Sequence, residues 1–459
     1  MLDSPHKAIS PVDGRYVALT KELVPYVSEY ALMGYRLRVE TEYLMALSEL
    51  RGFGPRRFSK KEIALLRKLP ILTEGDAEHI KEIETTTNHD VKAIEYYLRE
   101  KLADSSLKDV TEWIHFGITS EDTNNISYAL ILRDVLEAVI IPSLEKLQTE
   151  LSKLASKHAP TAMLARTHGQ AATPTTFGKE MEVFRSRLRR ELGKLNSFVI
   201  LSKLNGATGN YNALAAALPS IDWVAFSRKF IARASAFGKK ISIECNTATT
   251  QIEPHDSYAE LFQLLARINT ILIGFDQDMW RYISDGWVVQ KAVSGETGSS
   301  TMPHKVNPID FENSEGNLGL ANALLNFFAA KLPISRLQRD ISDSTVLRNF
   351  GVALAHSLIG YKSAIKGLGK IAPDRDAMKR ALLAHPEVIA EAIQIILRRE
   401  GVRDAYETLK TVTRGRNVSL KDLRTFIGNL SVSPSVKKEL LKLAPEAYIG
   451  LAKRLAKGQ

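Results

Sequence analysis

One apolar pattern in the second half of the chain limits the fold more than any other feature of the sequence. Across Leu261–Tyr282, apolar side chains recur at alternating spacings of four and three residues, and Gly286 and Val289 continue the spacing. This heptad pattern predicts one long amphipathic helix, and Ser257 with Glu260 fits a capping box at its start. Such a helix spans about 40 Å at 1.5 Å per residue, and it cannot bury its apolar stripe alone.

Two earlier segments repeat this spacing. Apolar residues of Ile140–Leu154 follow it throughout, and those of Phe177–Val199 follow it with one slip. Three long amphipathic helices in one region predict a helical bundle at the core, although stripes of this length also suit pairing between subunits. Strand patterns are scarce and show no alternation with helices, so the predicted fold class is all-α.

The regions that flank the bundle have shorter helical patterns. Gly52–Pro55 and Thr85–Thr87 interrupt the first region, and Pro373, Pro386 and Ser431–Ser435 interrupt the last. The chain has no internal repeat and no low-complexity tract. We therefore predict an N-terminal helical domain over residues 1–112, a central long-helix bundle domain over residues 113–365 and a C-terminal helical domain over residues 366–459.

Composition and charge exclude several classes of protein. The single cysteine, Cys245, cannot form an internal disulfide, which favours a cytoplasmic location. The first residues contain no apolar h-region, so no secretory signal is expected, and no run approaches the ~18 apolar residues of a membrane span. The net charge of +10 fits either nucleic-acid binding or anionic substrates. Arg185–Arg190 and Lys437–Lys442 alternate with leucine and lack aromatic interleaving, so solvated helix faces are favoured and no nucleic-acid partner is predicted.

Motifs of several common enzyme classes are missing from the sequence. It contains no GxxxxGK[ST] phosphate loop, no GxGxxG dinucleotide turn, no HExxH metal motif and no GxSxG nucleophile elbow. The ten histidines include no pair at ligand spacing on a helix face. We therefore predict no metal and no cofactor.

The segment Ser294–Pro308, SGETGSSTMPHKVNP, is the strongest candidate for chemistry. It runs into Asn307 and Pro308, which predict a helix N-cap followed by proline at the first helical position. The N–H groups of a helix N-terminus attract anions, and Lys305 adds a positive charge beside them. These features would stabilise a serine alkoxide or a substrate anion, whereas a mobile polar linker is the alternative that spacing leaves open.

Further polar clusters interrupt the helical patterns: RTHGQ at Arg166–Gln170, TTTNHD at Thr85–Asp90, WIHFGITSED at Trp113–Asp122 and RDISDSTVLR at Arg339–Arg348. Surface histidines, turns and caps are the simpler interpretation of the first three. In the fourth, Ser344 and Arg348 share a helix face, which suits a phosphate or carboxylate. An ion pair with Asp340 or Asp343 fits that spacing equally well. The residues alone thus indicate a helical enzyme with an anionic substrate.

Taken together, the motifs resemble a known family. GSSTMPHKVNP is similar to the GSSxMPxKxNP motif of the fumarase/aspartase superfamily of lyases, which are three-domain, all-α homotetramers with a central bundle of long helices. SPVDGRY at Ser10–Tyr16, TTTNHD, TSED at Thr119–Asp122, RTHGQ and the Ser344–Arg348 stretch resemble adenylosuccinate lyases of the longer bacterial type. Ala171 is one departure, because the family pattern has proline there.

The resemblance implies a carbon–nitrogen lyase of purine nucleotide biosynthesis. It would eliminate fumarate from adenylosuccinate, giving AMP, and from succinylated aminoimidazole carboxamide ribotide (SAICAR), giving AICAR. Ser299 would be the general base and His168 the general acid, with His89, His115 and Lys305 in support. Three subunits of a homotetramer would build each site. The matching substrate-binding positions are Arg15, Tyr16, Asn88, His89, Asp90, Thr119, Ser120, Gln251, Ser300, Lys305, Asn313, Arg339, Ser344, Thr345 and Arg348.

Two alternatives stay open at this point. Another lyase of the superfamily, such as an argininosuccinate lyase or a fumarase, would share the GSSxMPxKxNP motif. SPVDGRY and the Ser344–Arg348 stretch favour a phosphorylated substrate instead. A basic helical nucleic-acid-binding or scaffold protein is the alternative from a different class, and its binding would weaken steeply with salt.

Overall fold

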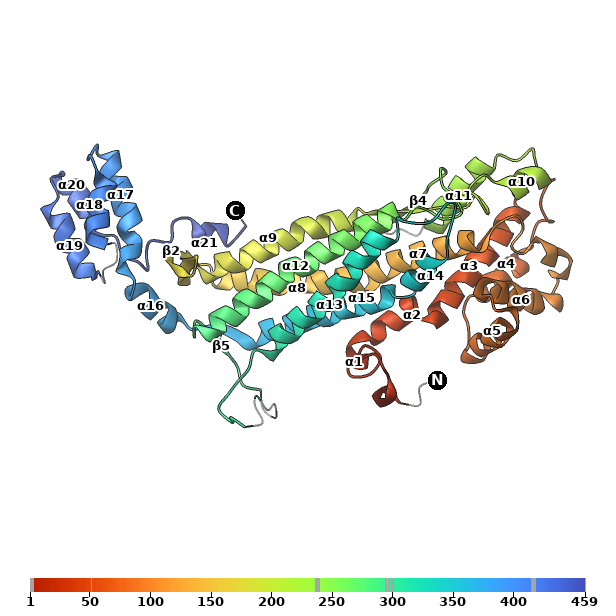
Figure 1. Cartoon of the computed structure of the whole chain (residues 1–459), viewed down its shortest axis with the longest axis horizontal. Coiled ribbons are helices and arrows are strands. Elements are labelled where there is room, and N and C mark those ends of the chain that lie inside the picture. The colour runs from red at the N-terminus through yellow and green to blue at the C-terminus, as the bar shows by residue number, and fades with distance from the viewer. Residues whose placement is uncertain are drawn as a thin grey trace. The chain divides into compact units, whose positions relative to one another are not determined.

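The computed structural model, shown in Figure 1, describes residues 4–50, 52–235, 240–293, 295, 298, 301–413 and 418–458. Its α-helices are α1 (Val17–Thr20), α2 (Val24–Val27), α3 (Glu29–Ser48), α4 (Lys60–Lys68), α5 (Glu74–Thr87), α6 (Asp90–Ala103), α7 (Ser120–Val135), α8 (Ile141–Lys157), α9 (Phe177–Asn196), α10 (Asn212–Ala217), α11 (Trp223–Ser235), α12 (Asp256–Ser284), α13 (Ile309–Lys331), α14 (Ser342–Leu347), α15 (Phe350–Lys370), α16 (Arg375–Leu383), α17 (Ala390–Arg399), α18 (Ala405–Thr413), α19 (Leu420–Asn429), α20 (Pro434–Leu441) and α21 (Ala452–Leu455). Short 3₁₀ turns are η1 (Pro5–Lys7), η2 (Lys21–Leu23), η3 (Lys108–Trp113) and η5 (Pro386–Ile389), and η4 (Leu136–Ile140) is a π-helical turn.

The strands are short and occur in pairs. β1 (Ala162–Thr167) pairs antiparallel with β2 (Gln170–Thr176), β3 (Val199–Ser202) pairs parallel with β4 (Ser242–Cys245), and β5 (Val288–Gln290) pairs antiparallel with β6 (Ile371–Pro373). Helices dominate the described chain, so the predicted all-α class is confirmed. Within the described ranges, no helix is both long enough and apolar enough to cross a membrane.

The chain forms two compact units, each assembled from separate segments. Unit 1 comprises Met1–Leu144, Glu191–Thr270 and Gly316–Lys362, and unit 2 comprises Glu145–Arg190, Ile271–Glu315 and Ser363–Gln459. Helices α8, α9, α12, α13 and α15 contribute residues to both. The division into three domains at residues 112 and 365 stays a prediction.

The predicted long helix is α12, but its start differs from the prediction. The helix begins at Asp256, and the carbonyl of His255 accepts the first helical hydrogen bond from the N–H of Ala259 at 2.9 Å. The Ser257 hydroxyl accepts instead from the N–H of Leu201 in β3 at 3.0 Å. The predicted capping box at Ser257 is therefore wrong, because a contact across the fold takes up its hydroxyl.

Helix α12 also ends before the apolar spacing does. Gly286 has a φ of 70°, and its N–H donates to the carbonyl of Ile283 at 3.0 Å, while that of Trp287 donates to Tyr282 at 2.9 Å. These bonds form a Schellman motif, and the Tyr282 and Trp287 rings stack across it at 6.1 Å. The expectation that Val289 continues the helix is wrong, since this residue lies in β5.

The two earlier heptad segments are confirmed as helices with similar corrections at their ends. Ile140 is the last residue of η4, and the rest of its segment lies in α8. Pro142 lacks the N–H that would continue the helical bonding, which explains a π turn just before it. Phe177 begins α9, whereas Val199 lies in β3 because it pairs with Ser242 of β4.

A hydrophobic core holds the first helices of unit 1 together. Leu37 and Leu44 of α3, Leu66 of α4, and Ile94 and Leu98 of α6 are fully buried in it. Helix α7 packs against α3.

Unit 1 also has an aromatic core. The rings of Phe262, Phe328 and Phe350 lie 4.8 to 5.5 Å from one another. Phe350 begins α15 soon after α14 ends, so this core fixes the position of α14.

Candidate active site

The predicted site residues are distributed over both units. His168, Lys305 and Asn313 belong to unit 2. Ser299 and Ser300 lie outside the described residues. Unit 1 holds the others: Arg15, Tyr16, Asn88, His89, Asp90, His115, Thr119, Ser120, Gln251, Arg339, Ser344, Thr345 and Arg348.

A carboxylate between two guanidinium groups lies at the start of α6. Asp90 Oδ2 accepts hydrogen bonds from Arg36 Nη2 and Arg348 Nη2, both at 2.7 Å. Arg36 is buried, and its Nε donates to Asn124 Oδ1 at 2.9 Å. Burial tends to raise the pKa of Asp90, but the two guanidinium groups outweigh it and lower this pKa to about 2. Two cations against one carboxylate leave a net positive charge, and the Arg348 side chain is 43% exposed. We call Arg36, Asp90 and Arg348 the Asp90 cluster.

His89 lies beside this cluster and caps α6. Its Nδ1 accepts from the N–H of Lys92 at 3.2 Å, which assigns the ring proton to Nε2, and Nε2 lies 3.4 Å from Ser120 Oγ. Asn88, in the left-handed conformation at φ 49°, ends α5 and turns the chain directly into α6. The structure thus brings His89, Asp90, Ser120 and Arg348 together, as the sequence predicted only from the resemblance.

Helix α14 and its C-terminal residue carry the predicted phosphate contacts. The N–H of Arg348 donates to the carbonyl of Ser344 at 3.4 Å, so the two residues share one face as their spacing predicts. Thr345, between them in sequence, is exposed. Arg348 pairs with Asp90, so it does not form the ion pair with Asp340 or Asp343 that the spacing left open. Arg339 Nη2 lies 3.8 Å from Asp343 Oδ1 instead.

Arg339 is the centre of a second group of charges. Its Nη1 donates to Gln251 Oε1 at 3.2 Å, and its Nη2 lies 3.1 Å from Glu121 Oε2. The N–H of Gln251 donates to the carbonyl of Gln338 at 3.3 Å, which joins the two segments through the backbone as well. The predicted contacts Arg339 and Gln251 are therefore neighbours.

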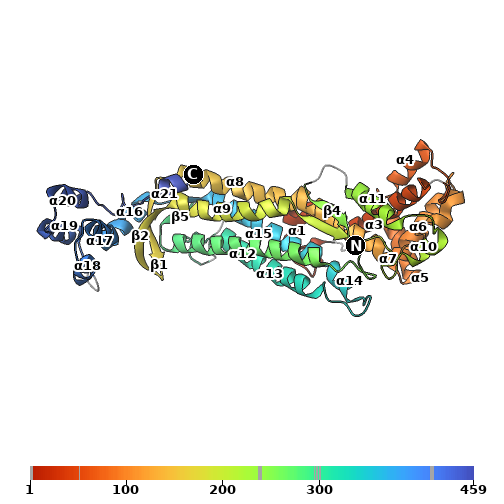
Figure 2. The same cartoon turned by 90° about the horizontal axis from the view of Figure 1, so that it is seen from above.

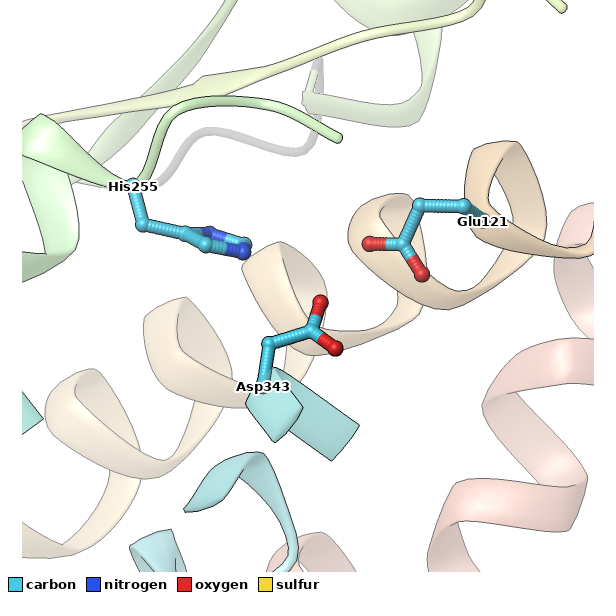
Figure 3. Close-up of side chains that lie close together, drawn as sticks. All are labelled: Glu121, His255 and Asp343. Carbon is cyan, nitrogen blue, oxygen red and sulfur yellow. The ribbon is translucent and has the colours of Figure 1, made fainter. Parts of the chain in front are cut away.

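Three buried side chains near Arg339 were not predicted from the sequence. Glu121 of α7, His255 just before α12 and Asp343 of α14 point toward one another, as Figure 3 shows, and their nearest ligand atoms all lie within 4.8 Å of one another. We call these three residues the Glu121 cluster. Burial raises the pKa of Glu121 to about 7, raises that of Asp343, and lowers that of His255 to about 4. No sequence spacing links these residues, because they come from three separate elements.

The segment TSED forms the predicted cap and also holds a buried ion pair. Thr119 and Asp122 make a capping box at the start of α7. Asp122 Oδ1 lies 2.9 Å from Lys203 Nζ, with both side chains fully buried, and accepts from the N–H of Asn205 at 3.0 Å. The loop after β3 is thereby fixed against the residues Thr119 and Ser120.

His115 pairs with a carboxylate that the sequence did not indicate. Its Nδ1 lies 2.7 Å from Glu40 Oε1 of α3, and the Thr123 hydroxyl donates to the same oxygen at 2.7 Å. Burial acts to lower the pKa of His115, but the Glu40 carboxylate outweighs it and raises that pKa. His115 therefore contacts a group 75 positions away in sequence, which no local pattern could reveal.

Arg15 and Tyr16 end a folded turn before α1. The N–H of Tyr16 donates to the carbonyl of Pro11 at 2.9 Å, and the Thr20 hydroxyl donates to the carbonyl of Val12 at 3.0 Å. Arg15 is exposed. The SPVDGRY segment is thus held by its own backbone and by α1.

His168 of unit 2 lies at the tip of the hairpin that β1 and β2 form in Figure 2. Thr167 pairs with Gln170, so the connection has two residues, His168 at φ 53° and Gly169 at φ 74°. Positive φ at both residues is the type I′ turn of tight hairpins. The sequence prediction of a simple break between helices missed these strands. The turn presents His168 on the surface of the chain.

The candidate loop is closed at its base. A Cβ at Gly298 would lie 1.8 Å from the carbonyl oxygen of Lys305, so only glycine fits. Asn307 Nδ2 donates to the carbonyl of Gly298. Helix α13 begins at Ile309, and its first hydrogen bond goes to the carbonyl of Pro308. The predicted N-cap at Asn307 is therefore wrong by one residue, because its amide closes the loop.

Lys305 and Asn313 flank the start of α13. The Lys305 side chain is exposed. Asn313 Nδ2 donates to Ser363 Oγ of α15 at 2.8 Å. Lys305 is thus open to solvent, whereas the amide of Asn313 is anchored within unit 2.

The chain is similar to known proteins over most of its length. A family model described as lyase matches residues 14–322, and one described as adenylosuccinate lyase C-terminal matches residues 335–449. The chain is 49% identical over 453 residues to the adenylosuccinate lyase of Legionella pneumophila (strain Corby), which covers 98% of each chain. It is 48% identical over 448 residues to the adenylosuccinate lyase of Escherichia coli (strain K12), and this alignment covers 97% of each chain.

Solved structures share the fold at lower identity. A fumarate lyase from Mesorhizobium sp. BNC1 superposes with a TM-score of 0.74 at 17% identity, over 95% of this chain and 97% of that one. A 3-carboxy-cis,cis-muconate lactonizing enzyme from Pseudomonas putida superposes with a TM-score of 0.73 at 22% identity, over 96% and 97%. The fold is therefore the fumarase-like all-α fold expected from the sequence.

Proposed function

The chain belongs to the adenylosuccinate lyase family, and from this premise we propose that it eliminates fumarate from adenylosuccinate, leaving AMP, and from SAICAR, leaving AICAR. The observation that carries this proposal is the surplus positive charge of the Asp90 cluster. One carboxylate at 2.7 Å from two guanidinium groups leaves one unit of charge for an anion.

The Asp90 cluster is suited to the phosphate that both substrates carry. Asp90 fixes the Arg348 guanidinium, whose remaining N–H groups can bind two phosphate oxygens in a planar fork. The Ser344 hydroxyl, one helical turn earlier, can donate to the same group. His89 and Ser120 add further hydrogen-bonding groups, and Arg15 with Tyr16 completes the proposed nucleotide contacts.

The chemical step divides between a base and an acid. Ser299 takes the proton from the succinyl carbon next to a carboxylate, and the electron pair forms an aci-carboxylate. Lys305 and the N-terminus of α13 stabilise this anion. The C–N bond then breaks as the C=C bond of fumarate forms, and His168 protonates the departing nitrogen. The exposed position of His168 on a two-residue turn supports this role, because a ring held there can meet a bound substrate.

The active form is proposed to be a cytoplasmic homotetramer in which three subunits build each site. One face of α13 is buried through Leu318, Leu325 and Phe328. Its other face exposes Leu320 by 56% and Phe327 by 53%, seven residues apart. Apolar residues at heptad spacing on a solvent face suit pairing with a second copy of the helix. Charged replacements at Leu320 and Phe327 should therefore dissociate the tetramer in light scattering and abolish activity together.

A substrate comparison tests the reaction. The purified chain is incubated separately with adenylosuccinate, argininosuccinate and malate while absorbance is followed. Adenylosuccinate alone should be cleaved. No change with adenylosuccinate would contradict the proposal, and cleavage of argininosuccinate would assign a different lyase reaction.

Two variants test the proposed base and acid. Ser299→Ala and His168→Ala should each lower kcat by at least ~10²-fold, the usual contribution of a positioned base or acid. Mixing the two inactive tetramers should restore part of the activity, because some sites then receive both intact residues from different subunits. Near-normal turnover in either folded variant would refute its role.

A further inference from the structure

The Glu121 cluster has one negative charge too many for its surroundings. Asp122 and Lys203 neutralise each other at 2.9 Å. Arg339 is then the cation that faces both remaining carboxyl groups, at 3.1 Å from Glu121 and 3.8 Å from Asp343. Glu121 and Asp343 are 0% and 3% exposed, so water cannot offset a second negative charge. Two ionised carboxylates this close in a buried site repel each other strongly.

The hydrogen-bonding groups of the cluster also lack partners. Apart from the ion pairs with Arg339, both carboxylate oxygens of Glu121, both of Asp343 and both ring nitrogens of His255 are buried with no hydrogen-bond partner among the described residues. Buried polar atoms almost always have a partner. A buried carboxyl group without hydrogen-bond partners is much less costly in its neutral, protonated form than as a carboxylate. One proton on this pair of carboxyl groups therefore removes the buried negative charge that Arg339 does not balance.

Three further titratable groups near the cluster have hydrogen-bond partners of their own. Glu253 accepts from Asn246 Nδ2 at 2.9 Å and from the N–H of His255 at 2.8 Å. The Tyr258 hydroxyl donates to the carbonyl of Asn125 at 3.3 Å. Asp340 accepts from the N–H of Ser342 at 2.8 Å. None of these supplies the missing positive charge.

We propose that Glu121 and Asp343 share one proton at neutral pH and that these residues, with His255, are positioning residues for Arg339. The second part rests on the proposed function, which makes Arg339 a substrate contact. With one proton present, the cluster and Arg339 together are neutral, and the guanidinium keeps its exposed edge for an anion. Loss of that proton would place a second negative charge beside Arg339 and weaken anion binding. The raised pKa values of both carboxyl groups agree with this arrangement.

Infrared spectroscopy tests the shared proton without any use of activity. A protonated carboxyl group has a C=O stretch that a carboxylate lacks, and wild-type protein at pH 7 should show a component from this cluster. Glu121→Gln and Asp343→Asn should each remove that component, because the carboxyl group that stays then ionises opposite Arg339. A component that survives in either folded variant would overturn the proposal. Asp276→Asn is the matched control. Asp276 is a buried residue of α12 whose pKa is also raised, so this variant should remove only the band of Asp276 and leave that of the cluster.

Substrate kinetics test the positioning role. Between about pH 7 and pH 9 the wild-type KM for adenylosuccinate should rise at least ~3-fold, while that of Glu121→Gln stays constant because its cluster cannot gain the extra charge. The kcat values should differ less than ~2-fold at pH 7, since no reacting atom is touched. Equal pH profiles for KM would overturn the positioning role. If adenylosuccinate is not cleaved at all, the proposed function fails. The infrared result still decides whether Glu121 and Asp343 share a proton.

A metal ion in place of the proton is the competing outcome. Histidine nitrogen and two carboxylates could bind Zn²⁺. The purified chain, dialysed against ZnCl₂ and then against buffer, should keep no zinc by elemental analysis. One equivalent of zinc in the wild type that His255→Ala loses would overturn the shared proton.

Discussion

The Asp90 cluster, and the Glu121 cluster taken together with Arg339, combine carboxyl and guanidinium groups in opposite proportions. In the first, one carboxylate lies between the guanidinium groups of Arg36 and Arg348, and in the second, one guanidinium group faces two carboxyl groups. The Arg348 side chain is 43% exposed, whereas that of Arg339 is 17% exposed. An open surplus of charge can be offset by a ligand from solvent, whereas we propose that the closed surplus beside Arg339 is offset by a proton. Accessibility, more than composition, decides which of the two occurs.

Loss of Asp90 should have the largest effect. Asp90→Ala leaves the buried Arg36 charge without its carboxylate, and breaking a buried pair on one side costs on the order of 3 kcal/mol of unfolding free energy. Urea denaturation measures this loss. Asp104→Ala, an exposed aspartate at the other end of α6, should change it by less than ~0.5 kcal/mol. Equal, small losses in both variants would show that Arg36 does not depend on Asp90.

Loss of Arg348 should affect binding more than stability. Arg348→Met removes the open cation, and a charge-assisted hydrogen bond is worth ~1.5–3 kcal/mol, which corresponds to a rise in KM of about 10- to 100-fold. Arg336→Met is the control, because that side chain is 84% exposed and, among the described residues, forms its ion pair with Asp340. Steady-state kinetics with adenylosuccinate compare the two. An unchanged KM for Arg348→Met would remove this residue from the phosphate site.

The two clusters should have opposite pH dependence of stability. The folded pKa of Asp90, about 2, lies below its usual value of 3.8, so its stabilisation is present above about pH 4 and is lost as pH falls toward 2. The folded pKa of Glu121, about 7, lies above its usual value of 4.5, so its stabilisation is present below about pH 4.5 and is lost as pH rises through 7.

Thermal unfolding of variants at several pH values separates these two pH dependences of stability. The Tm of Glu121→Gln minus the Tm of the wild type should rise from pH 5 to pH 8. The wild type is destabilised over this range as Glu121 loses its proton, and the Gln side chain has no proton to lose. Asp90→Asn should lose less Tm at pH 3 than at pH 6. Parallel profiles for both variants would contradict the contrast between the clusters.

Salt should produce the smallest effect. Raising ionic strength to about 0.15 M shortens the range of exposed charges to about 8 Å, so the wild-type KM should rise a few-fold and that of Arg348→Met should rise less. The Tm difference between Glu121→Gln and wild type should stay constant, because buried charges are screened little. A salt-dependent difference in Tm would indicate that water reaches the Glu121 cluster.

Helix periodicity predicted much of the fold, and it was wrong mainly at helix ends. The stripe over Leu261–Tyr282 lies within α12, and the family membership inferred from motifs is confirmed. The errors at Ser257 and Asn307 have one cause. Each side chain satisfies a group outside its own helix, Leu201 N–H or the Gly298 carbonyl, so local capping rules do not apply.

Part of the candidate site followed from the sequence, and part did not. Motif positions predicted His89, Asp90, Ser120 and Arg348, which the structure brings together. Their roles, and those of Ser299 and His168, stay predictions. Arg36 and Glu40 could not be found this way, because each contacts the site from α3 across the fold.

The sequence by itself determined the helical class, the long heptad helices and the family, since these depend on spacing along the chain. Tertiary structure alone decided the charge balance of each cluster. Asp90 and Arg348 are 258 positions apart, and Glu121, His255 and Asp343 come from three elements. Their pKa values depend on burial and on which charges the fold brings within a few ångströms, and neither quantity exists until the chain is folded.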